Sequence, residues 1–154
     1  MQNTGTLKVT TPTDREIVMT RVFDAPRALV FDALTKPELL RQWFFGPPGW
    51  SMVVCETAPK VGDTYRFVWR GPGGTEMGMR GVCQEIVPPE RIVATEKFDE
   101  AWYPGEALVT TALVEQGWQN HAHAHCALRV ARGPRCRPQD AHGAGCGRGL
   151  RQAG

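Results

Sequence analysis

A series of strand-like segments between residues 50 and 117 constrains the fold more than any other feature of the sequence. Five successive segments have the length and composition of β-strands, and they span residues 52–58, 64–70, 76–87, 91–98 and 107–115. Turns rich in Gly and Pro, such as the one at residues 71–74, separate them. Five consecutive strands with short connections predict an antiparallel meander.

Strand and helix patterns also occur before this meander. Residues 16–23 read as a further strand, and apolar residues then recur at helical spacing over 26–35 and, after Pro37, over 37–45. The chain of 154 residues suits one domain of the α+β class. A curved sheet with one apolar face must pack against something, and two short helices cannot cover all of it. We therefore expect a long amphipathic helix after residue 117.

Four segments carry a resemblance to a known family. They are PRALVFDALTKPELLRQWF, VGDTYRF, GVCQEIVPPERIV and EALVTTALVEQG. Together they resemble the START-like (SRPBCC) superfamily, and more closely its bacterial branch named for homology to activators of the 90-kDa heat-shock protein ATPase. The resemblance implies a helix-grip (START/Bet v-like) fold, in which a seven-stranded antiparallel sheet wraps round a long C-terminal helix and leaves a cavity between them. Only six of these strands are read here, and the helix is missing.

The C-terminal segment, residues 118–154, differs in composition from everything before it. Ala, Arg and Gly supply 19 of its 37 residues, all four histidines occur in it, and it shows no period of 2 or 3.6. We therefore divide the chain into a flexible N-terminus (1–13), an incomplete START-like ligand-cavity domain (14–117) and a non-native basic tail (118–154) predicted to be disordered. The seventh strand and the gripped helix are predicted to be missing or disordered.

A shifted reading frame explains this composition. Back-translation of the tail, read from the second base of the Trp118 codon, permits GKTTLTLTVLYESREARDAVLKT, one ambiguous residue, and then MEQGVAAGYDRL. This string alternates first as a strand and then carries apolar residues at helical spacing. We interpret the tail as the product of a frameshift. Because the tail would then supply no covering helix, the chain should be poorly stable.

Two alternative roles for the tail remain open. A cluster at His121, His123, His125 and Cys126, with further Cys and His beyond it, suggests a metal site, but its spacing is not that of zinc ligands. The tail also holds six Arg and one acidic residue, whereas residues 1–117 hold 12 basic and 15 acidic residues. A basic arm for nucleic acid would need interleaved aromatic residues. We expect no metal site, no cofactor and no nucleic-acid partner.

The aromatic residues are the better functional lead. Any single one is more often a core residue than a ligand contact, but several rigid rings on curved strands could line a cavity for a flat or apolar ligand. The candidates are Trp43, Phe44, Trp50, Tyr65, Phe67, Trp69, Phe98 and Trp102.

Glu96 completes the candidate site. It shares its strand phase with Ile92, Ala94 and Phe98, so an inward-facing phase would bury its carboxylate. The alternative is that Glu96 pairs with an arginine such as Arg80, or that a bulge turns it to solvent. Cys55 and Cys83 lie in apolar segments and are predicted to be inert buried thiols.

These features favour a binding module for a small hydrophobic or aromatic molecule. The resemblance supports a second hypothesis, a co-chaperone-like activator of the 90-kDa heat-shock protein ATPase. A third is a cyclase or hydratase type of enzyme, which the absence of histidine from residues 1–117 weakens because histidine is the commonest general base. The polar N-terminus has no signal-peptide pattern and no apolar run is long enough to cross a bilayer, so we expect a cytoplasmic protein with no membrane partner.

Overall fold

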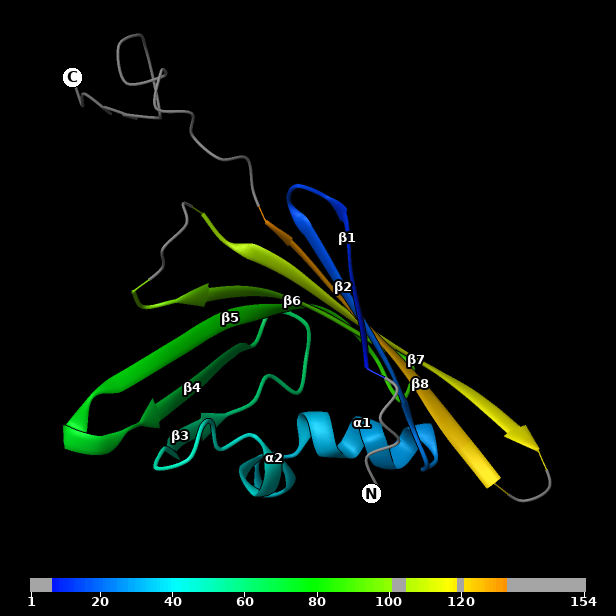
Figure 1. Cartoon of the computed structure of the whole chain (residues 1–154), viewed down its shortest axis with the longest axis horizontal. Coiled ribbons are helices and arrows are strands. Elements are labelled where there is room, and N and C mark those ends of the chain that lie inside the picture. The colour runs from blue at the N-terminus through cyan, green and yellow to red at the C-terminus, as the bar shows by residue number, and fades with distance from the viewer. Residues whose placement is uncertain (1–6, 101–104, 119–120, 133–154) are drawn as a thin grey trace, which may run out of the picture.

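The computed structural model describes residues 7–100, 105–118 and 121–132 (Figure 1). Its helices are α1 (Arg27–Thr35) and α2 (Pro37–Trp43), with a short 3-10 turn, η1 (Pro72–Gly74). Its strands are β1 (Lys8–Thr13), β2 (Glu16–Phe23), β3 (Ser51–Glu56), β4 (Thr64–Arg70), β5 (Glu76–Val87), β6 (Arg91–Phe98), β7 (Ala107–Trp118) and β8 (His121–Arg132).

The eight described strands form one curved antiparallel sheet in the order β1-β2-β8-β7-β6-β5-β4-β3. Strands β3 to β7 follow one another in this order, which confirms the predicted meander. The tight turn between β4 and β5 contains Gly73 and Gly74 with φ of 75° and 81°, a conformation that glycine adopts without steric cost. With two helices against this sheet, the architecture is the α+β helix-grip class expected from the sequence.

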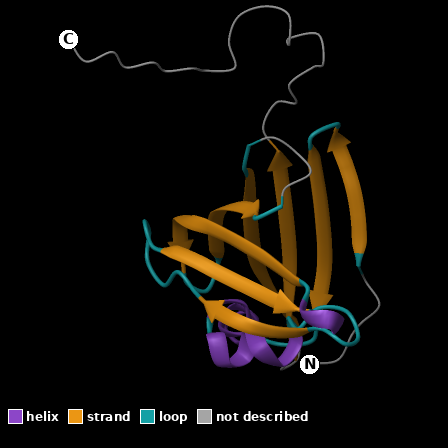
Figure 2. Ribbon diagram, turned by 90° about the vertical axis from the view of Figure 1, so that its left-hand side faces the viewer, coloured by secondary structure: helices purple, strands orange, loops and turns teal. Residues whose placement is uncertain are grey.

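Both helices pack on the same face of the sheet (Figures 1 and 2). Helix α1 lies under the end formed by β7 and β8, where Val30 and Phe31 bury themselves against Leu113 and Ala124. We call these four residues the α1 cluster. Helix α2 lies beside β3, where a second group packs, here called the α2 cluster: Leu40, Met52, Cys55, Trp69 and Met79.

Strand β8 corrects the prediction that the seventh strand is missing. Residues 121–132 pair with β7 over their whole length and residues 124–131 pair with β2, and Ala124 is fully buried in the α1 cluster. A local sequence signal existed, because residues 122, 124, 126, 128 and 130 are all apolar and alternate with His, Ala or Arg. Averaging over the 37-residue tail concealed it. The predicted disorder of residues 133–154 and the expected C-terminal helix lie outside the described residues.

Strand β1 corrects part of a second prediction, that residues 1–13 are flexible, and residues 1–6 of that range lie outside the described residues. Residues 8–13 pair with β2 at the edge of the sheet, with Val9 opposite Met19. Every residue of β1 is exposed, so the strand has no buried face to impose an apolar phase on its sequence. The sheet consequently has two more strands than the six read from the sequence.

A candidate ligand cavity

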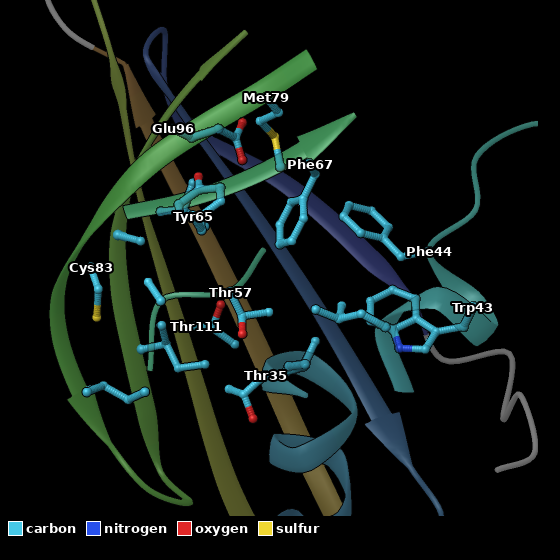
Figure 3. A pocket seen from close by; sticks show the side chains of 17 residues that line it. Thr35, Trp43, Phe44, Thr57, Tyr65, Phe67, Met79, Cys83, Glu96 and Thr111 are labelled. Atoms are coloured by element: carbon cyan, nitrogen blue, oxygen red, sulfur yellow. The ribbon is translucent and has the colours of Figure 1, made fainter. Parts of the chain in front are cut away.

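The inner face of the sheet, the face that carries both helices, contains a cavity of about 360 Å³ (Figure 3). It lies between the end of α1, α2, the segment after β3, and strands β4 to β7. Its lining is mainly apolar. The lining residues are Leu34, Thr35, Leu40, Trp43, Phe44, Thr57, Ala58, Tyr65, Phe67, Met79, Cys83, Ile86, Ile92, Ala94, Glu96, Val109 and Thr111.

Aromatic rings in edge-to-face and tilted contacts build one wall of this cavity. Phe44, just after α2, meets Phe67 edge to face with 5.8 Å between ring centroids, and Tyr65 lies 5.2 Å from Phe67. Trp43 donates its indole N–H to the carbonyl of Ala33 at 2.9 Å, which fixes its ring between the two helices. Such ring contacts add about 0.5–1.5 kcal/mol beyond the effect of burial alone, so they favour the observed ring orientations.

The position of Tyr65 depends on a glycine in the neighbouring strand. Gly81 is the register partner of Tyr65, and a Cβ there would lie 2.5 Å from the tyrosine ring and 1.8 Å from the carbonyl oxygen of Thr95. The bare backbone lets the ring lie across β5, where its hydroxyl donates to that same Thr95 carbonyl at 2.7 Å. A glycine under an aromatic ring is a known device for pinning strand register.

Glu96 lies in the lining of the cavity, as one of the two alternatives for it predicted. Figure 3 shows its carboxylate at the same end as Tyr65, Phe67 and Met79, with Thr35 at the opposite end. Arg80 lies beside Asp99 instead, at 3.5 Å, and Asp99 is held by both terminal nitrogens of Arg66. The pairing of Glu96 with an arginine such as Arg80 stays a prediction.

Five of the nine predicted candidates thus line one cavity, namely Trp43, Phe44, Tyr65, Phe67 and Glu96. Three others belong to the α2 cluster or its edge. Trp69 is 3% exposed and donates its indole N–H to the carbonyl of Phe44 at 2.7 Å, so it supports the aromatic wall from behind. Trp50 and Phe98 pack against the same cluster, and Trp102 lies outside the described residues.

The sequence did not identify the aliphatic and hydroxyl-bearing part of the lining. Ile86, Ile92 and Val109 share an inward strand phase that the alternation does show, but alternation cannot distinguish a hollow part of a face from a packed part. The hydroxyls of Thr57 and Thr111 also face the cavity (Figure 3). Thr35, in contrast, donates its hydroxyl hydrogen to the Phe31 carbonyl at 2.8 Å.

The two thiols of the described core are chemically quiet. Cys83 lines the cavity but is only 2% exposed, and burial raises the pKa of its thiol. Burial likewise raises the pKa of Cys55, against a smaller opposing effect of Arg41. A raised pKa disfavours the nucleophilic thiolate, which agrees with the prediction of inert buried thiols. The described lining therefore offers shape, aromatic surface and one carboxylate rather than a nucleophile with its base.

Within residues 7–100, 105–118 and 121–132 no group of three or more His, Cys, Asp or Glu is arranged to hold a metal ion. None of the helices in these ranges has the length and apolar character needed to cross a membrane.

The curved antiparallel sheet, the two helices on its inner face and the cavity between them define a helix-grip domain of the START-like type. The chain belongs to the family described as Activator of Hsp90 ATPase homolog 1-like protein, whose family model matches residues 24–152. No curated protein matches the chain.

Solved structures agree with this assignment. A protein from Rhodobacter sphaeroides is 31% identical, with a TM-score of 0.74 over 82% of this chain and 78% of the other. A protein from Chromobacterium violaceum is 27% identical, with a TM-score of 0.64 over 84% and 88% of the two chains. An HSP90 activator from Plasmodium falciparum is 22% identical, with a TM-score of 0.57 over 78% and 74%, a likeness that concerns the fold alone.

Proposed function

We propose that the protein binds a small hydrophobic or aromatic molecule in the cavity of its inner sheet face. The observation that carries this proposal is a space of about 360 Å³ with an aromatic wall and few polar groups. Cavities that hold small molecules typically measure about 300–1,000 Å³ and combine an apolar lining with a few placed polar side chains. The proposal makes the protein a carrier or sensor rather than a catalyst.

The rigidity of the wall supports this proposal over a simple packing defect. Trp43, Tyr65 and Trp69 each donate a hydrogen bond to a backbone carbonyl, so none of these side chains is free to collapse into the space. An open space lined by fixed side chains loses dispersion contacts that a ligand restores. The cavity is therefore organised before binding, which lowers the entropic cost of taking up a ligand.

A neutral fluorescent probe tests the proposal. N-phenyl-1-naphthylamine gains fluorescence in apolar surroundings, and saturable binding with one site per chain is expected. Binding should also raise the melting temperature, since a ligand at about 100 times its Kd adds roughly 2.7 kcal/mol to the free energy of unfolding. The absence of saturable binding and of any thermal shift would remove the proposal.

A matched pair of variants locates the probe. Ala94→Leu adds bulk inside the cavity and should abolish probe binding while the fold remains. Ala112→Leu makes the same change on β7 next to Thr111, whose side chain lines the cavity. Because successive strand residues point to opposite faces, this variant adds its bulk outside the cavity and should bind the probe normally. Equal loss in both variants would point to general unfolding instead.

The family description favours a second candidate, activation of the ATPase of an Hsp90-type chaperone. This function needs a protein-docking surface and not an occupied cavity. Steady-state ATP hydrolysis by a bacterial Hsp90 with increasing amounts of this protein tests it directly. Stimulation that the Ala94→Leu variant retains would support the chaperone role, whereas unchanged ATP hydrolysis and no complex on gel filtration would exclude it.

A further inference from the structure

Two hydroxyl groups face the cavity from separate elements of the fold. Thr111 lies on β7, and Thr57 lies in the segment that follows β3. Three strands separate β7 from β3 in the sheet, so the curvature of the sheet brings both side chains to one cavity. Figure 3 shows them between the end with Glu96 and the end with Thr35. The middle of a mainly apolar cavity therefore carries two hydroxyls.

These two hydroxyls differ from other polar groups of the lining. The hydroxyls of Tyr65 and Thr35 and the indole N–H of Trp43 each donate to a backbone carbonyl. In the part of the chain that the structure describes, no side-chain hydrogen bond engages the hydroxyl of Thr57 or Thr111. A threonine hydroxyl can donate one hydrogen bond and accept others. This capacity is available to a molecule inside the cavity.

Packing does not account for the hydroxyl of Thr111. The residues in the same phase of β7, Val109 and Leu113, are aliphatic, and so is its register partner Ile92 on β6. Valine has the same branched shape and suits a strand equally well, but it places no polar atom in an apolar space. A hydroxyl in such a space needs a hydrogen-bond partner to offset the cost of leaving bulk water. A ligand inside the cavity can be that partner.

Three classes of ligand are therefore unequal at these hydroxyls. A hydrocarbon that fills the cavity displaces water from both hydroxyls and gives no hydrogen bond in return. An ionised group loses its hydration, and the described lining has no Lys, Arg or His to pair with an anion. A neutral hydroxyl on the ligand both donates and accepts, so it matches a threonine hydroxyl whichever way that hydroxyl is turned.

Resting on the proposed ligand-binding function, we propose that the cavity selects small phenols, that is, flat aromatic molecules with a neutral hydroxyl. The phenol hydroxyl is hydrogen-bonded by Thr57 and Thr111, and the ring lies against the aromatic wall at Phe44 and Phe67. A volume of about 360 Å³ limits the ligand to one or two rings with short substituents. Thr57 and Thr111 are the specificity-determining residues of the cavity, and they select by hydrogen bonding.

Three probes with the same ring and ethyl group test this inference. 4-Ethylphenol carries a hydroxyl, 4-ethyltoluene replaces it with a methyl group of similar size, and 4-ethylbenzoate carries a carboxylate. Displacement of bound N-phenyl-1-naphthylamine from the full chain near neutral pH measures the three affinities. 4-Ethylphenol should bind most tightly, at least about threefold more tightly than 4-ethyltoluene, because a net hydrogen bond corresponds to about threefold to tenfold in affinity. A cavity that recognises apolar surface alone would prefer 4-ethyltoluene, the more hydrophobic of the two.

Substitutions of threonine by valine assign the preference to its residues. Thr57→Val and Thr111→Val remove one hydroxyl each, and each should weaken 4-ethylphenol by about threefold to tenfold without weakening 4-ethyltoluene. Thr110→Val makes the same change on the neighbouring residue of β7, whose side chain points to the other face of the sheet, and should leave both affinities unchanged. If a cavity variant does not fold, the ranking in the unsubstituted chain still decides, because it needs no variant.

The outcomes separate this inference from the function on which it rests. Binding of 4-ethyltoluene or 4-ethylbenzoate as tight as that of 4-ethylphenol overturns the phenol preference and leaves the apolar binding function standing. A bound naphthylamine probe that none of the three compounds displaces has the same meaning. No saturable binding of the naphthylamine probe removes the proposed function and the inference together. A preference for 4-ethylphenol that Thr110→Val retains and Thr111→Val loses supports both.

Discussion

The two strands of the β7–β8 hairpin come from sequence regions of opposite character, yet they lie side by side in one sheet. Strand β7 ends the region whose sequence predicts strands throughout, and β8 lies in the Ala-, Arg- and Gly-rich tail. Their backbones pair from Ala107 opposite Arg132 to Trp118 opposite His121. Backbone hydrogen bonds do not depend on the side chains, so a poor sequence can complete a ladder whose two neighbours, β2 and β7, are already in place.

The side chains reveal the difference that the backbone conceals. In the α1 cluster β7 contributes Leu113 and β8 contributes Ala124, both almost fully buried. Burial contributes about 0.8 kcal/mol per CH₂ group, so the leucine adds several times more than the alanine can. At this place in the α1 cluster, β8 therefore adds less to the stability than β7 does. Under the reading-frame hypothesis, the tail was not selected for this place in the sheet.

The largest expected effect comes from moving the reading frame. A chain translated from the second base of the Trp118 codon should gain a covering helix, and its free energy of unfolding should rise by at least about 3 kcal/mol. Several large side chains would become covered at roughly 1.5–3 kcal/mol each, which is a large share of a total of about 5–15 kcal/mol. Urea unfolding of the two chains measures the difference.

A chain that stops after Gly117 is the control for this comparison, since it lacks β8 as well. The present chain should be poorly stable, but more stable than this shorter one because β8 completes the ladder between β2 and β7. Equal stability of the present and the reframed chains, or a cooperative melt of the present chain at ordinary mesophile temperatures, would count against the hypothesis. Sequencing the gene across codons 117 and 118 tests it independently.

The second effect in size separates the two faces of β7. Leu113→Ala should lower the free energy of unfolding by about 2–5 kcal/mol, because it leaves a hole between the sheet and α1. Val114→Ala, on the other face at 55% exposure, should change it by no more than about 0.5 kcal/mol. Similar values for both variants in urea titrations would mean that α1 does not cover this part of the sheet.

The two regions also show how far sequence reasoning reaches. Between residues 16 and 117 the alternation of apolar residues predicted every strand, because each has one face against the helices or the cavity. Strand β1 could not be predicted in this way, since an exposed edge strand such as KVTTPT places no demand on its side chains. Strand β8 was missed for another reason, because the composition of the whole tail outweighed a local alternation over residues 121–131.

The predictions for the cavity residues show a similar contrast. Aromatic residues and Glu96 could be predicted because large rings and a carboxylate in an apolar phase are conspicuous in a sequence. Trp50 and Trp69 were overpredicted, since the same strand phase serves both a packed cluster and a hollow one. Trp69 lies under the wall that Phe44 forms, and Trp50 lies over Gly71, where a Cβ would come within 2.5 Å of the indole. Such placement depends on helix positions that strand periodicity does not contain.

The third expected effect tests the packing of β8 itself. Ala124 is 0% exposed, so Ala124→Leu should overpack the α1 cluster and cost about 1–3 kcal/mol of stability. Ala131→Leu, on the same strand in the opposite phase, should cost less. If Ala124→Leu is neutral or stabilising in urea titrations, this end of β8 is not packed against α1, and the contrast between the two strands becomes greater than the structure indicates.

The smallest effects concern two ion pairs. One lies within residues 16–117, and the other joins this region to the tail. Arg129 of β8 reaches Glu16 of β2 at 2.6 Å, and as an exposed pair it should contribute about 0–1 kcal/mol, measurable by a double-mutant cycle. Within residues 16–117, Arg66 donates to both carboxylate oxygens of Asp99 at 2.6–2.7 Å. This pair lies over Gly78, where a Cβ would clash with both partners. Because it has two hydrogen bonds and space above the glycine, the pair of Arg66 and Asp99 should stabilise the protein more than the pair of Arg129 and Glu16.

Acid titration provides the sharpest test of that ranking. The hydrogen bonds from Arg66 hold the pKa of Asp99 below its usual value. A carboxyl whose pKa is lower in the folded state stabilises the protein above its unfolded pKa, about 3.9 for Asp, and this contribution is lost as the pH falls through the folded value. Asp99→Asn should therefore be less stable than the unsubstituted chain near neutral pH, with the gap closing below about pH 4. A difference in stability that persists at acid pH would show that Asp99 acts through packing over Gly78 and not through its charge. The pair of Arg66 and Asp99 would then have no electrostatic advantage over the pair of Arg129 and Glu16.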